Sequence, residues 1–119
     1  MKLGFIGTGK ITSSVITGIC KSDIKYKKIL ISSRNRRISK NLKKRFNKIL
    51  IEKDNQKIIN NSDWVFLAVT PNVGEKIIKD LKFKSNQIIV SFISTITIDQ
   101  LKQMIEVKAD IVRAIPLPP

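Results

Sequence analysis

The sequence contains no histidine, and its single cysteine, Cys20, excludes an internal disulfide bond. Without histidine, catalysis by an imidazole acid or base and metal binding through histidine nitrogen are both excluded. Cys20 falls within the first helical pattern of the chain and is predicted to be a small core residue. We therefore predict no metal site, and the residue types present identify no catalytic acid or base.

Long apolar runs are also missing, since none reaches the roughly 20 residues that a membrane-spanning helix needs. The chain opens directly into a predicted strand, with no pattern of a signal peptide. We therefore expect a cytoplasmic protein with no membrane partner. With 119 residues, of which 42% are hydrophobic, the chain is expected to form one domain over residues 1–119 that folds without disulfide or metal staples.

Acidic residues are few, and the net charge is +14, from 23 basic and 9 acidic residues. Eight of the basic residues are concentrated in one stretch, as Arg34, Arg36, Arg37, Lys40, Lys43, Lys44, Arg45 and Lys48. Such a field attracts polyanions, and a nucleic-acid-binding face is one hypothesis for this stretch. The few aromatic residues lie mostly in strand or core patterns and form no platform for base stacking. A solvated helix face is the favoured interpretation, and a nucleic-acid partner is not expected.

A glycine turn near the N-terminus carries the most specific functional signal. The apolar run Leu3–Ile6 predicts a buried parallel strand, and an amphipathic helix is predicted after Gly9, with one apolar face made of Ile11, Val15, Ile16 and Ile19. Between a strand and a helix, Gly7-x-Gly9 indicates a dinucleotide site, whose pyrophosphate binds the free N–H groups of the helix N-terminus. Thr12 occupies the third glycine position, which predicts a slightly wider strand–helix spacing. The alternative is a glycine turn without a ligand.

Apolar runs predict five further strands, at residues 29–31, 49–51, 64–69, 88–92 and 111–115. Helical patterns between them cover residues 39–47, a short segment around 58–59, residues 73–81 and a segment after Thr97, which is predicted to form a capping box with Gln100. Strands that alternate with helices predict an α/β protein, a doubly wound Rossmann fold with a mainly parallel sheet and helices on both faces. Ligands bind such sheets at the carboxyl ends of the strands.

The end of the second predicted strand is informative about the cofactor. NAD-specific folds have an acidic residue there, which binds the adenine ribose, but this chain has Ser33 and Arg34. An arginine favours a 2′-phosphate, because its guanidinium binds phosphate in a bidentate manner and the serine hydroxyl can also donate. The sequence therefore favours NADP, with NADPH preferred over NADH. The alternative is an N-cap serine followed by a surface arginine.

Several stretches, in order along the chain, resemble the N-terminal domain of pyrroline-5-carboxylate reductase, the NAD(P)H enzyme that completes proline synthesis. They are Gly4–Ile11, Asp54–Asn55, Ser62–Pro71, Ile89–Ser91 and Val112–Pro116. The coenzyme F420-dependent NADP oxidoreductases share much of this pattern. The resemblance implies hydride transfer from NADPH to the C=N bond of a small imino acid.

The resemblance also implies a cofactor site along the carboxyl edge of the sheet. Its pyrophosphate part comprises Gly7, Thr8, Gly9, Lys10 and Ile11, and its adenosine part comprises Ser33, Arg34 and Asn55. Its nicotinamide part comprises Ala68, Val69, Thr70 and Pro71, with Ile93 and Ser94. Members of the family continue into an all-helical domain that forms a homodimer and supplies much of the substrate pocket. This chain lacks that domain, so alone we expect it to be monomeric and weakly active or inactive.

Three differences from the family pattern lie near the reacting end of the cofactor. Thr70 stands where the family usually has lysine, Ile93-Ser94-Thr95 replaces Ala-Ala-Gly, and Leu117-Pro118 replaces a polar Asn and Thr. These differences favour an alternative hypothesis, a non-catalytic nucleotide-binding or sensor module of the same superfamily.

Overall fold

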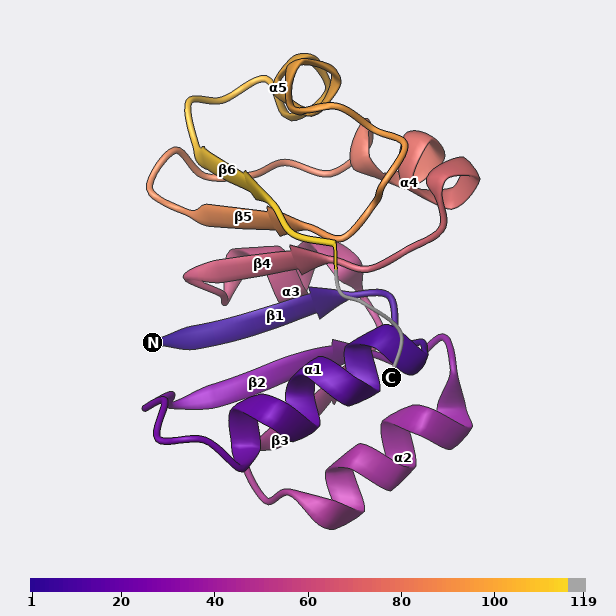
Figure 1. The fold of residues 1–119 in the computed structure, drawn as a ribbon, viewed down its shortest axis with the longest axis vertical. Coiled ribbons are helices and arrows are strands. Elements are labelled where there is room, and N and C mark those ends of the chain that lie inside the picture. The colour runs from indigo at the N-terminus through magenta and orange to yellow at the C-terminus, as the bar shows by residue number, and fades with distance from the viewer. Residues whose placement is uncertain (116–119) are drawn as a thin grey trace.

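A computed structural model of the protein describes residues 1–115, in which six strands alternate with five helices (Figure 1). The strands are β1 (Lys2–Ile6), β2 (Lys28–Ser32), β3 (Ile49–Glu52), β4 (Trp64–Leu67), β5 (Ile88–Ser91) and β6 (Asp110–Arg113). The helices are α1 (Lys10–Cys20), α2 (Arg36–Arg45), α3 (Asn55–Asn60), α4 (Pro71–Ile78) and α5 (Ile98–Ile105). The predicted alternation of strands and helices is confirmed.

The strands form one sheet in the order β3-β2-β1-β4-β5-β6, and every pairing in it is parallel. The chain starts at the centre of the sheet with β1, moves outward to β3, and then crosses back to add β4 on the other side of β1. The strand order therefore reverses between β1 and β4. In doubly wound sheets this switch point is the place where ligands bind.

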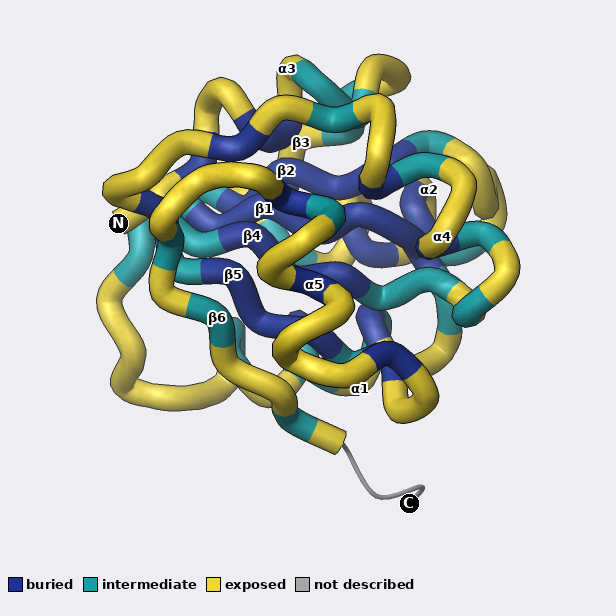
Figure 2. Tube along the Cα trace, turned by 90° about the horizontal axis from the view of Figure 1, so that it is seen from above, coloured by how far each residue is buried: buried dark blue, intermediate teal, exposed yellow. Residues whose placement is uncertain are grey.

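The sheet separates two hydrophobic layers, because successive side chains of a strand face opposite sides. Phe5 of β1 belongs to one layer with Ile16 of α1 and Leu42 of α2, and Ile6 belongs to the other with Ile78 of α4 and Leu101 of α5. The residues Ile58 and Ile59 of α3 also pack in the second layer. Figure 2 shows the central strands buried beneath helices whose outer faces are exposed. Helices on both faces confirm the doubly wound Rossmann fold.

Two helices begin earlier than the sequence predicted. Helix α2, expected over residues 39–47, begins at Arg36 because the Asn35 side chain accepts a hydrogen bond from the Ile38 N–H at 3.2 Å and caps the helix. It ends at Arg45, since the backbone of Phe46 is extended. Helix α4, expected over residues 73–81, begins at Pro71, because a proline at the first helical position lacks only an N–H that would have no intrahelical acceptor.

The strand boundaries also differ from the prediction. Strand β4 ends at Leu67 instead of Val69, and β6 covers residues 110–113 instead of 111–115. Residues 68–70 therefore leave the sheet and can line a cleft. The predicted capping box of α5 is confirmed, with reciprocal hydrogen bonds between Thr97 and Gln100. The predicted features Leu117 and Pro118 lie outside the described residues. Within residues 1–115, no helix is long and apolar enough to cross a membrane.

Candidate nucleotide-binding site

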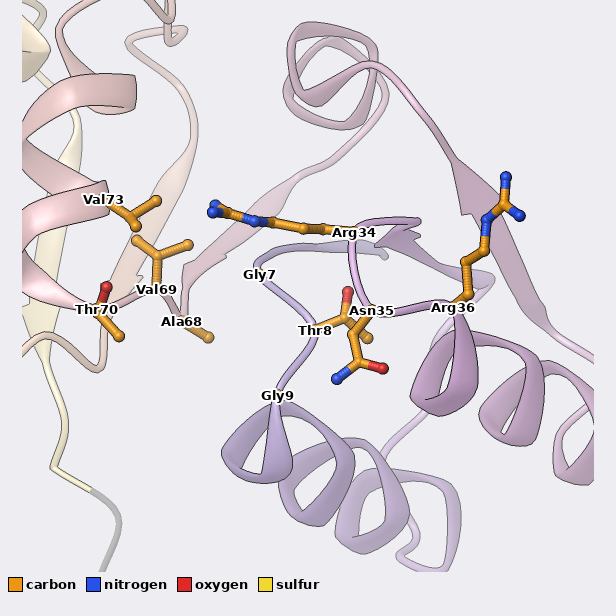
Figure 3. A pocket seen from close by; sticks show the side chains of 10 residues that line it. All are labelled: Gly7, Thr8, Gly9, Arg34, Asn35, Arg36, Ala68, Val69, Thr70 and Val73. Carbon is orange, nitrogen blue, oxygen red and sulfur yellow. The ribbon is translucent and has the colours of Figure 1, made fainter.

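A cleft of ≈ 610 Å³ lies at the carboxyl edge of the sheet, at the switch point between β1 and β4. Its lining falls into three groups, shown in Figure 3. The floor is the glycine turn Gly7–Gly9, the β2 wall comprises Arg34, Asn35 and Arg36, and the β4 wall comprises Ala68, Val69, Thr70 and Val73. The cleft volume is within the range of typical small-molecule sites.

The floor owes its shape to Gly7. Its φ of 98° is in the region that favours glycine, and a Cβ placed there would lie 2.3 Å from the carbonyl oxygen of Ala68. The turn can therefore pack directly against the chain that leaves β4. Thr12 is fully buried and its hydroxyl donates to the Gly7 carbonyl at 2.9 Å, so this side chain connects helix α1 to the turn.

The first turn of α1 offers unpaired N–H groups to the cleft. Gly9 is the N-cap and provides no capping side chain, and the first helical hydrogen bond runs from the Ser13 N–H to the Gly9 carbonyl at 3.0 Å. A Cβ placed on Gly9 would meet no atom within 4 Å, so the space in front of the helix is open. Free N–H groups, a positive helix end and open space together fit an anionic group such as a pyrophosphate.

The β2 wall is cationic. Arg34 is exposed, and in Figure 3 its side chain extends across the cleft toward Val69 and Val73. Arg36 also lines the cleft, but its guanidinium points away from it (Figure 3). Asn35 connects the two arginines and caps α2. The guanidinium of Arg34 is therefore the charge best placed to meet an anion in the cleft.

The β4 wall is mostly aliphatic. Its single polar side chain is that of Thr70, which is exposed and forms no capping hydrogen bond with α4. The side chains of Val69 and Val73 face the cleft beside it (Figure 3). This wall offers no group that titrates near neutral pH.

The cleft brings together part of the predicted site, namely Gly7, Thr8, Gly9, Arg34, Ala68, Val69 and Thr70. The other predicted residues do not line it. Lys10 and Ile11 are exposed on the first turn of α1, Ser33 is half-buried at the end of β2, and Asn55 and Pro71 are the half-buried first residues of α3 and α4. The binding roles of both groups stay predictions.

Ile93 and Ser94 were predicted to line the nicotinamide side, and they too lie outside the cleft lining. Ile93 is buried beneath α4, where its Cδ1 would be 3.0 Å from a Cβ placed on Gly74. Ser94 is exposed, and its carbonyl accepts a hydrogen bond from the guanidinium of Arg113. The loop after β5 therefore contacts α4 and β6 instead of lining the cleft.

Three lining residues were missed by the sequence analysis. Asn35 and Arg36 could have been found by reading Asn35 as a helix cap, because this begins α2 directly after the Ser33–Arg34 segment. Val73 could have been found by reading Pro71 as the first residue of a helix, because the first turn of that helix then follows the cleft residues Ala68, Val69 and Thr70. Within residues 1–115, no group of three or more Cys, Asp or Glu side chains could hold a metal ion.

A family model described as "NADP oxidoreductase coenzyme F420-dependent" matches residues 2–95 of the chain. The chain belongs to this family. The family resemblance stated from the sequence is therefore confirmed.

Individual relatives are similar to the chain over nearly its whole length. Pyrroline-5-carboxylate reductase 3 of Danio rerio is 29% identical over 98% of this chain, which corresponds to 41% of the relative. The ComE operon protein 4 of Bacillus subtilis is 26% identical over 98% of this chain and 43% of its own length. The chain thus spans less than half the length of these relatives.

Among solved structures, the pyrroline-5-carboxylate reductase of Coxiella burnetii has a TM-score of 0.82 at 23% identity, over 98% of this chain and 44% of that one. The Plasmodium falciparum pyrroline carboxylate reductase, solved with NADP bound, has a TM-score of 0.80 at 22% identity, over 98% and 42%. At these identities the likeness establishes the fold.

Proposed function

We propose that the chain is the NADP(H)-binding domain of a reductase similar to pyrroline-5-carboxylate reductase, in which NADPH reduces the C=N bond of a small imino acid. The observation that carries this proposal is the position of the cleft. It lies at the switch point of a doubly wound sheet, with a glycine turn and a helix N-terminus as its floor and an arginine on its wall. The similarity to pyrroline-5-carboxylate reductases over 98% of the chain supports the reaction type.

The residues present fit a phosphorylated dinucleotide. The pyrophosphate would bind the N–H groups of the turn and of the first residues of α1, and Arg34 would bind the 2′-phosphate of the adenosine half, with Ser33 beside it. The cofactor itself supplies the hydride, and the protein positions it. Because only NADPH carries the 2′-phosphate that Arg34 would bind, we expect NADPH to bind more tightly than NADH.

Calorimetric titration of the chain with NADPH and NADH tests the proposal. We expect Arg34→Ala to weaken NADPH binding by about 10- to 100-fold, the usual loss of a charge-assisted hydrogen-bond pair, and to leave NADH binding within about twofold. Arg37→Ala is the matched control, because Arg37 is an exposed arginine three positions further along the chain, in the first turn of α2, that does not line the cleft. Absence of binding of either nucleotide to the unmodified chain would contradict the proposal.

A second candidate function is a nucleotide-binding sensor module without catalysis. The aliphatic β4 wall favours it, because Thr70 replaces the lysine that the family usually has, and Ile93 is buried in the core. A steady-state assay with NADPH and pyrroline-5-carboxylate separates the two functions. Reduction by the native protein, with any further domain that its gene encodes, excludes the sensor function, whereas tight NADPH binding without turnover in that protein supports it.

A further inference from the structure

Three buried hydroxyl groups connect the floor of the cleft to the segment that carries its β2 wall. Thr8, Ser32 and Ser39 have exposed fractions of 5%, 5% and 1%. They belong to three different elements, since Thr8 is the middle residue of the floor, Ser32 is the last residue of β2 and Ser39 lies in the first turns of α2. These are the elements that carry the floor and the β2 wall.

The carbonyl oxygen of Ser32 is the centre of this hydroxyl network. It accepts hydrogen bonds from the hydroxyls of Thr8, at 2.7 Å, and Ser39, at 2.8 Å. The Ser32 hydroxyl lies 2.6 Å from that of Thr8 and can donate to it. The Ser39 hydroxyl is also 2.8 Å from the Asn35 carbonyl, so its single proton is shared between the Ser32 and Asn35 carbonyls. Within residues 1–115, no buried side-chain nitrogen or oxygen atom is left without a partner, so the network is fully satisfied.

The position of the network links it to the candidate site. The Ser32 carbonyl belongs to the peptide that leads from β2 into Ser33 and Arg34, so the two hydroxyls that bind it orient the start of the β2 wall. Thr8 provides the side chain of the floor between two glycines. Fixing Thr8 on Ser32 therefore fixes the spacing between the floor and Arg34. A buried polar network contributes little net stability compared with apolar packing, but it specifies one arrangement.

We propose that Thr8, Ser32 and Ser39 are positioning residues for nucleotide selectivity. They hold the floor and the β2 wall at one spacing, so that the pyrophosphate and the 2′-phosphate of NADPH are bound at the same time. This inference rests on the proposed function, because it needs a nucleotide in the cleft. NADH lacks the 2′-phosphate, so its binding does not depend on the position of Arg34.

Ser39→Ala is the first test, because it releases the β2 wall and leaves the floor on Ser32. We expect the Kd for NADPH to rise about five- to tenfold, as for the loss of one positioning hydrogen bond, and the Kd for NADH to change less than about twofold. Thr8→Val removes the other hydroxyl at nearly constant volume; because Thr8 also belongs to the floor, we expect it to weaken the binding of both nucleotides, and that of NADPH more than that of NADH. Thr8→Ser retains the hydroxyl and should restore most of the NADPH affinity.

Ser62→Ala is the matched control for loss of stability alone. Ser62 has an exposed fraction of 5%, and its hydroxyl donates to the Ile58 carbonyl at 2.6 Å, just before β4 and away from the cleft. It should lower the midpoint of urea unfolding about as much as Ser39→Ala and leave both nucleotide affinities unchanged. In an Arg34→Ala background, Ser39→Ala should have no further effect on NADPH binding, because the residue it positions is absent.

The outcomes separate the two proposals. Selective loss of NADPH affinity in Ser39→Ala, abolished in the Arg34→Ala background, supports the positioning role. If the unmodified chain prefers NADPH and Ser39→Ala keeps that preference, or loses affinity for both nucleotides equally, the positioning role is wrong and the proposed function stands. If the unmodified chain binds neither nucleotide, the proposed function is wrong and the positioning role is wrong with it.

Discussion

The β2 wall and the β4 wall of the cleft face each other but have opposite chemistry. The β2 wall carries two arginines and an asparagine at the start of a strongly basic helix. The β4 wall carries aliphatic side chains and a single hydroxyl, that of Thr70. Both walls follow strands that pair with β1, so the same parallel topology supports two very different surfaces.

This difference indicates that the two walls have different roles. The floor and the β2 wall hold N–H groups and a cation, which under the proposed function would bind the phosphates of the dinucleotide. The β4 wall contributes a mostly aliphatic surface, and it holds no acid or base. Under the proposed function, the floor and the β2 wall would therefore supply most of the affinity for the nucleotide.

The largest expected effect concerns the floor, on which both walls depend. In Gly7→Ala, the new Cβ would lie 2.3 Å from the Ala68 carbonyl oxygen at a φ of 98°. We expect the free energy of unfolding to fall by about 2–5 kcal/mol, from backbone strain and overlap, measured by urea denaturation.

Gly9→Ala is the informative counterpart. The new Cβ meets no atom within 4 Å, and the backbone φ of −107° suits any residue, so stability should change by less than about 1 kcal/mol. The methyl group would occupy the space in front of α1. NADPH binding should therefore weaken at least about tenfold, because the pyrophosphate could no longer approach the backbone closely. Unchanged NADPH affinity would show that the open space at Gly9 is not the pyrophosphate site.

The sequence predicted the fold and the floor well, because both depend on local patterns. Apolar runs, the Gly7-x-Gly9 turn and the Thr97–Gln100 capping box each specify their own structure over a few residues. Strands that alternate with helices can be connected in only a few ways within a parallel sheet. The position of the cleft at the carboxyl edge of the sheet therefore followed from the order of the elements.

Other parts of the site depended on tertiary packing and were predicted less well. Whether Ile93 faces the cleft or the core depends on how α4 lies on β5, and Gly74 lets the helix approach closely enough to bury it. The hydroxyl network joins Thr8, Ser32 and Ser39 across 31 positions of sequence, and no local pattern reveals such a contact. Asn35 was missed because the start of α2 was placed too late.

A smaller effect is expected on the β4 wall. Thr70→Lys introduces the cation that the family usually has, at an exposed position that forms no side-chain cap. We expect NADPH and NADH both to bind up to about fivefold more tightly, as for a surface charge pair, and the preference for NADPH to stay unchanged. Titrations of the two nucleotides at low and moderate salt measure this. An altered preference would mean that the β4 wall also reads the adenosine phosphate, and the division between the walls would be wrong.

The smallest effect on binding is expected at the far end of α1. There the Tyr26 hydroxyl donates to the Cys20 sulfur at 3.1 Å, and this bond together with burial raises the pKa of Tyr26 to about 12. Since the ordinary tyrosine pKa is about 10, this bond stabilises the fold fully below pH 10, and that contribution is lost as the pH rises through 12.

Tyr26 is the single tyrosine of the chain, so phenolate absorbance reports its titration directly. Cys20→Ala removes the hydrogen-bond acceptor and should move the midpoint toward 10. Cys20 lies about 15 Å along α1 from the floor, at 1.5 Å per residue, so NADPH affinity at neutral pH should stay within about twofold. A larger loss of affinity would mean that nucleotide binding depends on residues beyond the carboxyl edge of the sheet. The floor and the two walls would then not account for the whole binding site.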